Sequence, residues 1–324
     1  MKYRPFGKTG VQVSEIGHGT WAMGFMWGQR QDPEAKAALR RGFELGINFI
    51  DTAYLYGNGH SERLIGEVMR ETKEKPFVAT KIPPNIKEWP PKPGTPPDQA
   101  FAAAYLTDIT ERSLKNLGVE CIDLQQLHVW RPDWLGQGEW LSAVEKLKAQ
   151  GKIRFFGVSL NDHDADSGLE LVATGLIDSV QVIFNLFEQR PREKLFPACI
   201  KHGVGVIARV PLDEGGLSGT LREGMKFEKG DWRVHYFKGD RIKQTIEHAK
   251  QFEFLIGGEV QSLPQAALKF CLSEPAVSTV IPGMRTVKHV EADAAVSDLP
   301  DFTTAALARS HALAWPRNFY PTIW

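Results

Sequence analysis

The chain has 324 residues, 42% of them hydrophobic, and its 39 basic and 39 acidic side chains give a formal net charge of zero. This length supports one large core, so we expect a single domain over residues 1–324. A chain without excess charge has no general attraction for nucleic acid or for an anionic membrane surface. We expect neither a membrane span nor a secretory signal, because apolar runs stay below the ~18 residues that cross a bilayer and the N-terminus is polar.

Three cysteines, Cys121, Cys199 and Cys271, are few and widely spaced. This spacing fits neither a disulfide framework nor a zinc site. We therefore expect three buried thiols, a reducing cytoplasmic location and no bound metal.

The first elements in chain order are the two strands of a β-hairpin. Residues 3–6 and 11–13 flank a turn with glycine at both ends, which is typical of a hairpin. Short apolar runs then alternate with amphipathic ones. The runs predict strands at residues 15–19, 46–51, 77–81, 121–128, 155–159, 179–183, 204–209 and 277–281. Helices are predicted at residues 33–45, 61–71, 98–117, 140–150, 164–174, 191–202, 264–273 and 286–296, with Asp32 and Ser61 as N-caps of the first two.

The predicted strands are too short and too apolar to be half-exposed antiparallel strands, and they are typical of buried parallel ones. A strand followed by a helix, repeated about eight times, predicts a parallel sheet with crossover helices. At this number of repeats the sheet is expected to close into a (β/α)8 TIM barrel. We expect the hairpin to cap the N-terminal end of that barrel.

Two long irregular segments and an aromatic tail lie outside the alternation. Residues 82–97 carry seven prolines, and residues 213–239 are rich in glycine and charge. Each follows a predicted strand and should emerge at the C-terminal face, where long loops commonly bind ligands or act as lids. The tail, residues 315–324, is expected to pack onto the body, and one candidate position is over the active site.

Four ionisable side chains lie at or just beyond predicted strand ends: Asp51, Tyr56, Lys81 and His128. Strand ends of a barrel converge on one rim, so these residues can meet in space. Singly, each is more often structural than functional. Together they suit carbonyl reduction. A phenol donates the proton, an ammonium lowers the phenol's pKa from ~10, a carboxylate holds the ammonium, and an imidazole positions the substrate oxygen.

The stretch GINFIDTAYLYGNGHSERLIG, residues 46–66, resembles the signature of the aldo-keto reductase family. Further matches extend the resemblance over nearly the whole chain: GKTGVQVSEIGHGTW, ATK, DLQQLH, FFGVS, QVIFN, GVIARVPLDEGGLSG and TVIPGMRTVKHVEA. The resemblance implies an oxidoreductase that reduces aldehydes or ketones with NADPH, or with NADH, and uses Tyr56 as the proton donor. It also implies a cofactor on the barrel rim without a Rossmann domain, in agreement with the lack of a convincing G-x-G-x-x-G motif.

The resemblance also implies the cofactor contacts: Thr20, Trp21, Asp51, Ser159, Gln181, Arg209, Pro211, Leu212, Gly216, Gly283, Arg285, Lys288 and Glu291. Arg285 and Lys288 open a predicted helix and suit the 2′-phosphate of NADP. The alternative for both is a solvated surface cation. Asp213 and Glu214 are unfavourable beside phosphate, so they should form a latch across the cofactor or point to solvent.

Two positions depart from the family pattern. Leu160 stands where relatives carry an asparagine that binds the nicotinamide carboxamide, which leaves that contact to Ser159, Gln181 or Asn161. Arg209 stands where many relatives carry an aromatic residue. Its planar guanidinium can stack on a ring, and the alternative is a buried ion pair.

Aromatic residues in loops near the rim predict an apolar pocket for the carbonyl substrate: Trp21, Trp27, Trp89 and Trp130, with Tyr56 and His128 at its base. We expect a small-molecule substrate and no nucleic-acid or membrane partner, and the oligomeric state is open. The alternative function is a nicotinamide-binding regulatory subunit of the same fold, which acts through a partner. The intact set of four ionisable residues argues against it.

Overall fold

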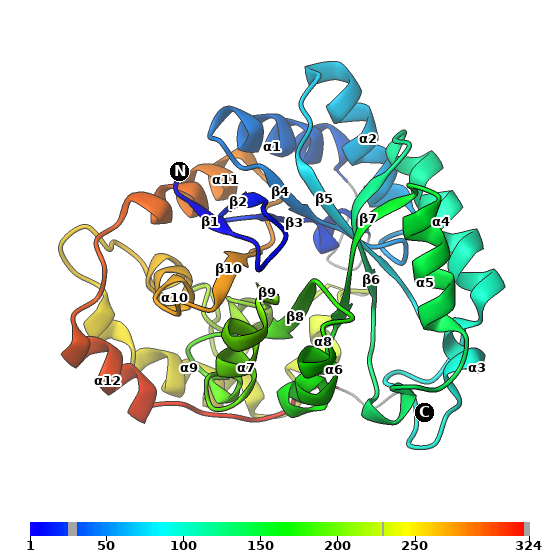
Figure 1. Cartoon of the computed structure of the whole chain (residues 1–324). Coiled ribbons are helices and arrows are strands. Elements are labelled where there is room, and N and C mark those ends of the chain that lie inside the picture. Colours follow the sequence, from blue (N-terminus) through cyan, green and yellow to red (C-terminus); the bar gives the residue numbers. More distant parts are fainter. Residues whose placement is uncertain (25–30, 229, 321–324) are drawn as a thin grey trace.

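The computed structural model describes residues 1–24, 31–228 and 230–320. Eight parallel strands follow one another in chain order: β3 (His18–Gly19), β4 (Phe49–Asp51), β5 (Phe77–Ile82), β6 (Ile122–Leu127), β7 (Ile153–Ser159), β8 (Ser179–Ile183), β9 (Gly205–Arg209) and β10 (Val277–Val280) (Figure 1). Parallel bridges join Ile16 to Val280 and Gly19 to Gly283, which connects the first strand to the last. The strands therefore form the (β/α)8 barrel that the sequence predicted.

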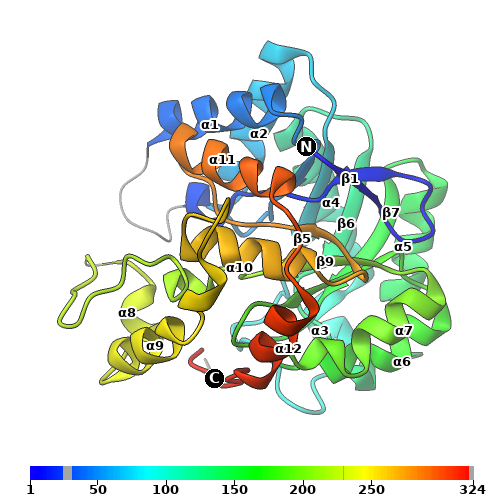
Figure 2. The ribbon, with the colours of Figure 1, turned by 90° about the vertical axis from the view of Figure 1, so that its left-hand side faces the viewer.

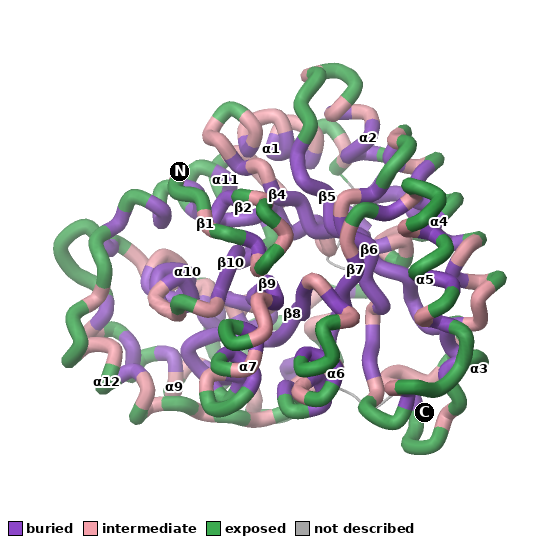
Figure 3. Tube along the Cα trace, viewed as in Figure 1, coloured by how far each residue is buried: buried purple, intermediate pink, exposed green. Residues whose placement is uncertain are grey.

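Helices surround the strands: α1 (Asp32–Glu44), α2 (His60–Thr72), α3 (Pro97–Phe101), α4 (Ala103–Leu117), α5 (Trp140–Ala149), α6 (Leu169–Thr174), α7 (Leu195–His202), α10 (Leu263–Leu272) and α11 (Val287–Ala294). The strands are buried along almost their whole length, and the outer faces of the helices are exposed (Figure 3). None of the helices in the described part of the chain has the length and apolar character needed to cross a membrane.

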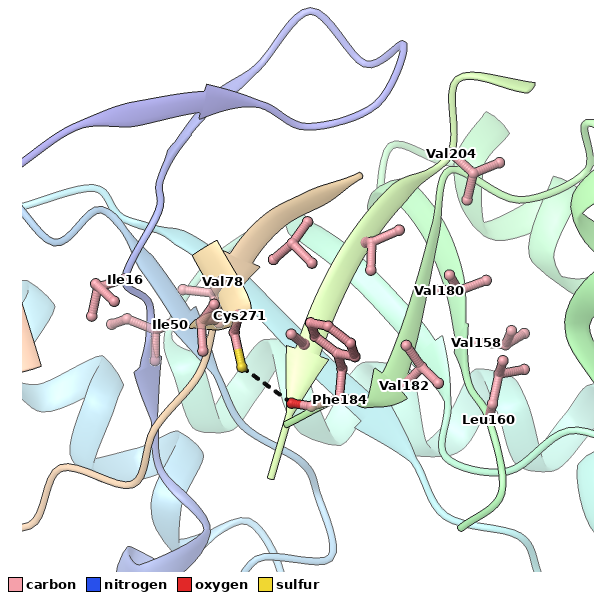
Figure 4. Close-up of a cluster of buried hydrophobic side chains, with 14 of the residues drawn as sticks. Ile16, Ile50, Val78, Val158, Leu160, Val180, Val182, Phe184, Val204 and Cys271 are labelled. Carbon is pink, nitrogen blue, oxygen red and sulfur yellow. Dashed lines mark hydrogen bonds between the residues drawn. The ribbon is translucent and has the colours of Figure 1, made fainter. Parts of the chain in front are cut away.

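The larger core lies between the strands and the helices. Strand side chains that point away from the barrel axis fill it, among them Ile50, Val78 and Val180 (Figure 4). Cys271 of α10 joins them and donates its thiol proton to the carbonyl oxygen of Phe184 at 3.3 Å. Each such apolar side chain contributes about 1.5–3 kcal/mol through burial, which explains why the outward-facing positions of these strands are apolar.

The N-terminal hairpin, β1 (Tyr3–Pro5) and β2 (Gln12–Ser14), closes the N-terminal end of the barrel as expected. Phe6 is fully buried, and its ring centroid lies 5.8 Å from that of Phe49 and 5.3 Å from that of Phe77. The next residue, Gly7, has φ of 54°, and a Cβ there would lie 2.5 Å from the carbonyl oxygen of Gly203. Glycine is therefore required where the hairpin meets the barrel.

Several helix boundaries differ from the predictions. Asp32 lies inside α1 with Gln31 at the cap position, and Gly59, with φ of 77°, is the N-cap of α2. Ser61 lies inside α2, where its hydroxyl oxygen accepts from the Thr52 hydroxyl at 2.9 Å and its proton is donated to the Thr20 hydroxyl at 2.8 Å. The single helix predicted at residues 98–117 is divided into α3 and α4, because Ala102 has an extended ψ of 144°.

Three helices lie outside the predicted repeat: α8 (Arg233–Tyr236), α9 (Arg241–Lys250) and α12 (Thr304–Ala312). Figure 2 shows α8, α9 and the red segment that follows α12 on the same side of the barrel. The prediction of three buried thiols was wrong for Cys121, which is exposed because it precedes β6 at the outer end of the strand, whereas Cys199 and Cys271 are buried.

Candidate active site

The four ionisable side chains singled out from the sequence meet at the C-terminal end of the barrel, and we refer to them as the rim cluster: Asp51, Tyr56, Lys81 and His128. Lys81, near the end of β5, is fully buried. Its Nζ donates to the two carboxylate oxygens of Asp51 at 2.8 and 2.7 Å and to the carbonyl oxygen of Thr52 at 2.8 Å. Burial lowers the pKa of Lys81, and the Asp51 carboxylate opposes this effect. The ion pair makes the buried charge tolerable.

Tyr56 is set in a turn after β4, where its backbone N–H donates to the carbonyl oxygen of Ala53 at 3.0 Å. Its hydroxyl oxygen lies 3.5 Å from Lys81 Nζ. Burial raises the pKa of Tyr56 well above its usual value, which is opposite to the lowering expected from the Lys81 ammonium. The Asp51 carboxylate raises it further, and the positive charge of Arg209 lowers it. The phenol therefore holds its proton at neutral pH, as a proton donor must.

His128 directly follows β6, and its ring centroid lies 6.0 Å from that of Tyr56. Burial, Lys81 and Arg209 all lower the pKa of His128, so its imidazole is neutral. Its Nδ1 is buried without a hydrogen-bond partner among the described residues. Trp89 packs edge-on against the imidazole with ring centroids 5.0 Å apart, so the proline-rich segment reaches the cluster, as expected for a rim loop.

The rim cluster combines a protonated phenol with a neutral imidazole around a buried ion pair. A phenol can deliver a proton to an oxygen that gains negative charge, and an imidazole N–H can hydrogen-bond the same oxygen. The arrangement is therefore suited to general-acid chemistry on an oxygen atom.

Two residues predicted to contact the nicotinamide line the same wall. The Thr20 hydroxyl donates to the backbone carbonyl oxygen of Asp51 at 2.8 Å, and Gln181 Nε2 donates to Asp51 Oδ1 at 2.6 Å. Ser159, the register partner of Gln181 on the neighbouring strand, is also buried. Thr20 therefore holds the backbone of Asp51, and Gln181 holds its carboxylate.

Arg209, at the end of β9, makes an ion pair. Its Nη2 donates to the carbonyl oxygen of Leu160 at 3.0 Å and to Asp162 Oδ1 at 2.8 Å. Leu160, the departure from the family pattern, is itself buried and packs against Gly168. Asp162 was not predicted as a site residue. Its position could have indicated one, because, like Asp51, it is a carboxylate close to the C-terminal end of a barrel strand, here β7.

Two buried polar atoms beside this ion pair lack a partner among the described residues: Arg209 Nε, a donor, and Asn161 Oδ1, an acceptor. The amide nitrogen of Asn161 is already used, because it donates to the carbonyl oxygen of Trp130 at 2.7 Å. Buried polar groups are rarely left without partners. A primary carboxamide, which has both an N–H donor and a C=O acceptor, has the complementary chemistry, so the residues present fit a nicotinamide.

The residues predicted along the pyrophosphate are folded onto their own segment. Pro211 and Gly216 are buried, Leu212 is half-buried, and the Gly216 N–H donates to the carbonyl oxygen of Asp213 at 2.7 Å. A Cβ at Gly216 would lie 2.4 Å from Asp213 Oδ2, so the close approach requires glycine. Contact of this segment with phosphate stays a prediction.

The N-terminus of α11 carries Arg285 and Lys288 on either side of its N-cap, Thr286, whose hydroxyl accepts the His289 N–H at 3.1 Å. Burial and these two cations lower the pKa of His289, so positive charge gathers at a helix end that already favours anions. Gly283, just before, is exposed and has open space around it. Glu291, which was predicted to contact the cofactor, forms an ion pair with Arg41 at 2.9 Å. Its contact with the cofactor stays a prediction.

The segment after β9 is joined to the C-terminal tail by a group of five residues, the tail latch: Asp213, Glu214, Tyr236, Arg317 and Tyr320. Asp213 accepts the Tyr236 hydroxyl at 3.0 Å and pairs with Arg317 at 2.5 Å. Glu214 accepts the Tyr320 hydroxyl at 2.6 Å, and burial raises the pKa of Glu214 to about 8. The two acidic residues therefore face the tail rather than solvent, and the tail packs onto the body as expected.

The predicted pocket aromatics have different surroundings. The ring centroid of Trp21 lies 6.0 Å from that of Trp232, which directly precedes α8. Trp130 is fully buried between Trp134 and Trp140, with ring centroids 6.0 and 5.4 Å away, and belongs to the outer core. The structure therefore brings Trp89, but not Trp130, against His128. Trp27 and the last four residues of the tail lie outside the described residues.

The comparisons with known proteins agree with this geometry. The model of the Aldo/keto reductase family matches residues 15–314. Methylglyoxal reductase YeaE of Escherichia coli (strain K12) is 31% identical over 299 residues, which cover 92% of this chain and 90% of that protein. A probable voltage-gated potassium channel subunit beta of Arabidopsis thaliana is 27% identical over 329 residues, 95% of this chain and 94% of that protein. The glycerol dehydrogenase AKR11B4 from Gluconobacter oxydans superposes with a TM-score of 0.77 at 27% identity, over 96% of this chain and 94% of that one.

The family match extends from β3 to the residues after α12 and so includes the barrel and the whole rim cluster. The chain therefore belongs to the aldo/keto reductase family, whose members are oxidoreductases with this barrel.

Proposed function

We propose that this protein reduces aldehydes or ketones to alcohols with NADPH. The observation that carries the proposal is the contact between Tyr56, Lys81 and Asp51 at the barrel rim, with His128 beside the phenol. Such an arrangement has little structural purpose, because an apolar core would be as stable without two buried charges.

The bound dinucleotide would supply a hydride to the carbonyl carbon. Gln181, Ser159 and Asn161 are the residues that would hold its nicotinamide end, and the unpaired Asn161 oxygen supports this assignment. Arg285 and Lys288 would hold the 2′-phosphate of NADPH at the N-terminus of α11. NADH is the alternative cofactor, because it lacks only this phosphate.

The protein's own side chains then handle the substrate oxygen. The neutral imidazole of His128 donates a hydrogen bond that positions the oxygen, and the Tyr56 hydroxyl gives up its proton to it as negative charge develops. The resulting phenolate lies 3.5 Å from the Lys81 ammonium, which stabilises it until a proton returns from solvent. Trp89 shields the imidazole and limits the access of water.

A carbonyl panel tests the proposal most directly. Purified protein is mixed with NADPH or NADH and with 4-nitrobenzaldehyde, methylglyoxal and simple ketones, and the loss of the reduced dinucleotide is followed by absorbance. Turnover of at least one carbonyl is expected, faster with NADPH than with NADH. Tyr56→Phe should lose at least about 10²–10⁴-fold in turnover, the usual contribution of general-acid catalysis, while it still binds NADPH.

The matched control is Tyr54→Phe, which removes a phenolic hydroxyl two residues away that accepts a hydrogen bond from Arg112 at 3.4 Å. This variant should retain turnover. Reduction by Tyr56→Phe at the unaltered rate would refute the role of the phenol as proton donor.

The alternative function, a nicotinamide-binding regulatory subunit, is supported by one observation, the similarity to a protein named as a potassium channel subunit beta. Dinucleotide binding without turnover of any carbonyl in the panel would favour it. The complete rim cluster favours the reductase. For either function we propose a cytoplasmic location, because the three cysteines are unpaired and two of them are buried thiols.

A further inference from the structure

Arg209 holds a fixed positive charge across the mouth of the barrel. It ends β9, where its register partner is Ile183 of β8, but its guanidinium contacts Leu160 and Asp162 in the loop after β7. The side chain therefore crosses the end of β8 and is anchored at both of its ends. With 18% of its surface exposed, it is screened only weakly by solvent.

The two charges of the ion pair between Arg209 and Asp162 act on different sets of groups. The arginine lowers the pKa of three members of the rim cluster and of two members of the tail latch, whereas the aspartate raises the pKa of those two latch members. The positive end of the pair thus acts on the site of reaction, while the tail latch is affected by both ends. Lys81, the other cation of the rim, contacts both oxygens of Asp51 and is largely neutralised there.

The charge of a nicotinamide ring depends on its oxidation state. In NADP⁺ the ring is a cation, and in NADPH it is neutral, while the phosphate groups are the same in both forms. A fixed cation beside the ring therefore interacts unfavourably with the oxidised form and leaves the reduced form unaffected. An aromatic side chain at this position would carry no net charge with which to discriminate between the two.

We propose that Arg209 is a cofactor-discriminating residue that makes the site bind NADPH more tightly than NADP⁺. This inference rests on the proposed function, which puts the nicotinamide at the barrel mouth. Preferential binding of NADPH and faster release of NADP⁺ both favour the reductive direction when the two forms are present together. Asp162 tunes the effect, since it neutralises part of the arginine's charge.

Equilibrium binding tests the inference without any catalysis. The quenching of tryptophan fluorescence gives the Kd of NADPH and of NADP⁺ for the wild type, Arg209→Met, Arg209→Lys and Asp162→Asn. The wild type should have the lower Kd for NADPH. Arg209→Met should reduce the ratio of the Kd of NADP⁺ to the Kd of NADPH by ~10-fold, equal to about 1.4 kcal/mol. Arg209→Lys keeps the charge and should keep the ratio, although both affinities fall as the planar fork is lost.

Asp162→Asn should change the ratio in the opposite direction, because the arginine remains and its counter-charge is gone. This variant keeps the inference testable if Arg209→Met fails to fold. The matched control is Arg192→Met, which removes an arginine paired with Glu274 before β10, at the other end of the barrel, and should leave both Kd values unchanged.

The outcomes separate the two proposals. If the wild type binds neither dinucleotide, the proposed function and this inference both fail. If both dinucleotides bind and Arg209→Met leaves their Kd ratio within twofold of the wild type, the discriminating role is refuted while the proposed function stands. A ratio that moves the same way in Arg209→Met and Asp162→Asn would also refute it.

Discussion

The two ends of the barrel use the same strands for opposite purposes. At the N-terminal end, β4 and β5 begin with Phe49 and Phe77, whose rings stack 5.5 Å apart beneath Phe6. At the C-terminal end the same two strands present Asp51 and Lys81, which form a buried ion pair. Because alternate residues of a strand share a face, the barrel interior changes from apolar to charged within two to four residues.

This contrast separates stability from chemistry. The apolar end gains stability from burial without any polar partner to satisfy. The polar end costs stability, since each buried charge must be paired, and this cost is typical of sites that bind or react with ligands. Substitutions at the two ends should therefore affect different measurements.

The largest effect is expected from Lys81→Met. The variant leaves the Asp51 carboxylate buried with only neutral partners, so the free energy of unfolding should fall by about 3–5 kcal/mol. Carbonyl turnover should fall by roughly 10²–10⁴-fold, because the phenolate of Tyr56 loses its cation. Urea unfolding and NADPH-dependent reduction measure the two effects.

The double variant Asp51→Asn/Lys81→Met distinguishes them. With both charges removed, much of the lost stability should return, but turnover should not. If the double variant recovered its activity together with its stability, the ion pair would be structural and the separation of the two ends would fail.

Phe6→Ala should give the reverse result at the other end. The side chain is fully buried, and removing such a ring costs about 3–5 kcal/mol of unfolding free energy. The folded variant should keep the kcat/KM of the wild type, because Phe6 lies at the end of the barrel opposite the rim cluster. A large fall in kcat/KM in protein shown to be folded by circular dichroism would contradict the comparison.

The regular part of the molecule was predictable from the sequence. The alternation of short apolar runs with amphipathic ones predicts the barrel, and the barrel in turn predicts that Asp51, Lys81 and His128 converge. The N-terminal hairpin was also predictable, because Gly7 and Gly10 mark its turn. In each case a local pattern determines the structure.

The irregular parts were not predictable, because their contacts join segments that no local pattern relates. The pairing of Arg317 with Asp213 depends on how the tail crosses the segment after β9, about a hundred residues away in sequence. Trp130 was predicted to line the pocket because it is aromatic and lies in a loop near the rim. Its side chain instead packs in the outer core between two other tryptophans. An aromatic side chain in a loop carries no sign of which side it will face.

Arg285 and Lys288 add positive charge to the polar end of the barrel, at the N-terminus of α11. Arg285→Ala/Lys288→Ala should weaken NADPH binding by ~10-fold or more and leave NADH binding nearly unchanged, since only NADPH has the 2′-phosphate. Fluorescence titration with both dinucleotides measures this. Arg40→Ala, which removes an arginine paired with Glu71 on the outer face of α1, is the control and should alter neither affinity. Equal losses for NADPH and NADH would remove the basis for NADP selectivity.

The smallest effect is the pH dependence of stability that Glu214 contributes at the polar end. Burial raises the pKa of Glu214 from an ordinary value of 4.5 to about 8, so the folded state holds this proton more tightly than the unfolded state. The stabilisation that the proton provides is complete below pH 4.5 and is lost as the pH rises to about 8, where the folded protein must ionise a buried acid.

Glu214→Gln keeps a carbonyl oxygen that accepts the Tyr320 hydroxyl, and it cannot ionise. Its free energy of unfolding should therefore fall less with rising pH than that of the wild type, whereas Glu291→Gln, at an exposed residue paired with Arg41, should follow the wild type. Parallel curves for Glu214→Gln and the wild type would show that this acid is ionised in the folded protein, and that the tail latch is held by charge rather than by a neutral hydrogen bond.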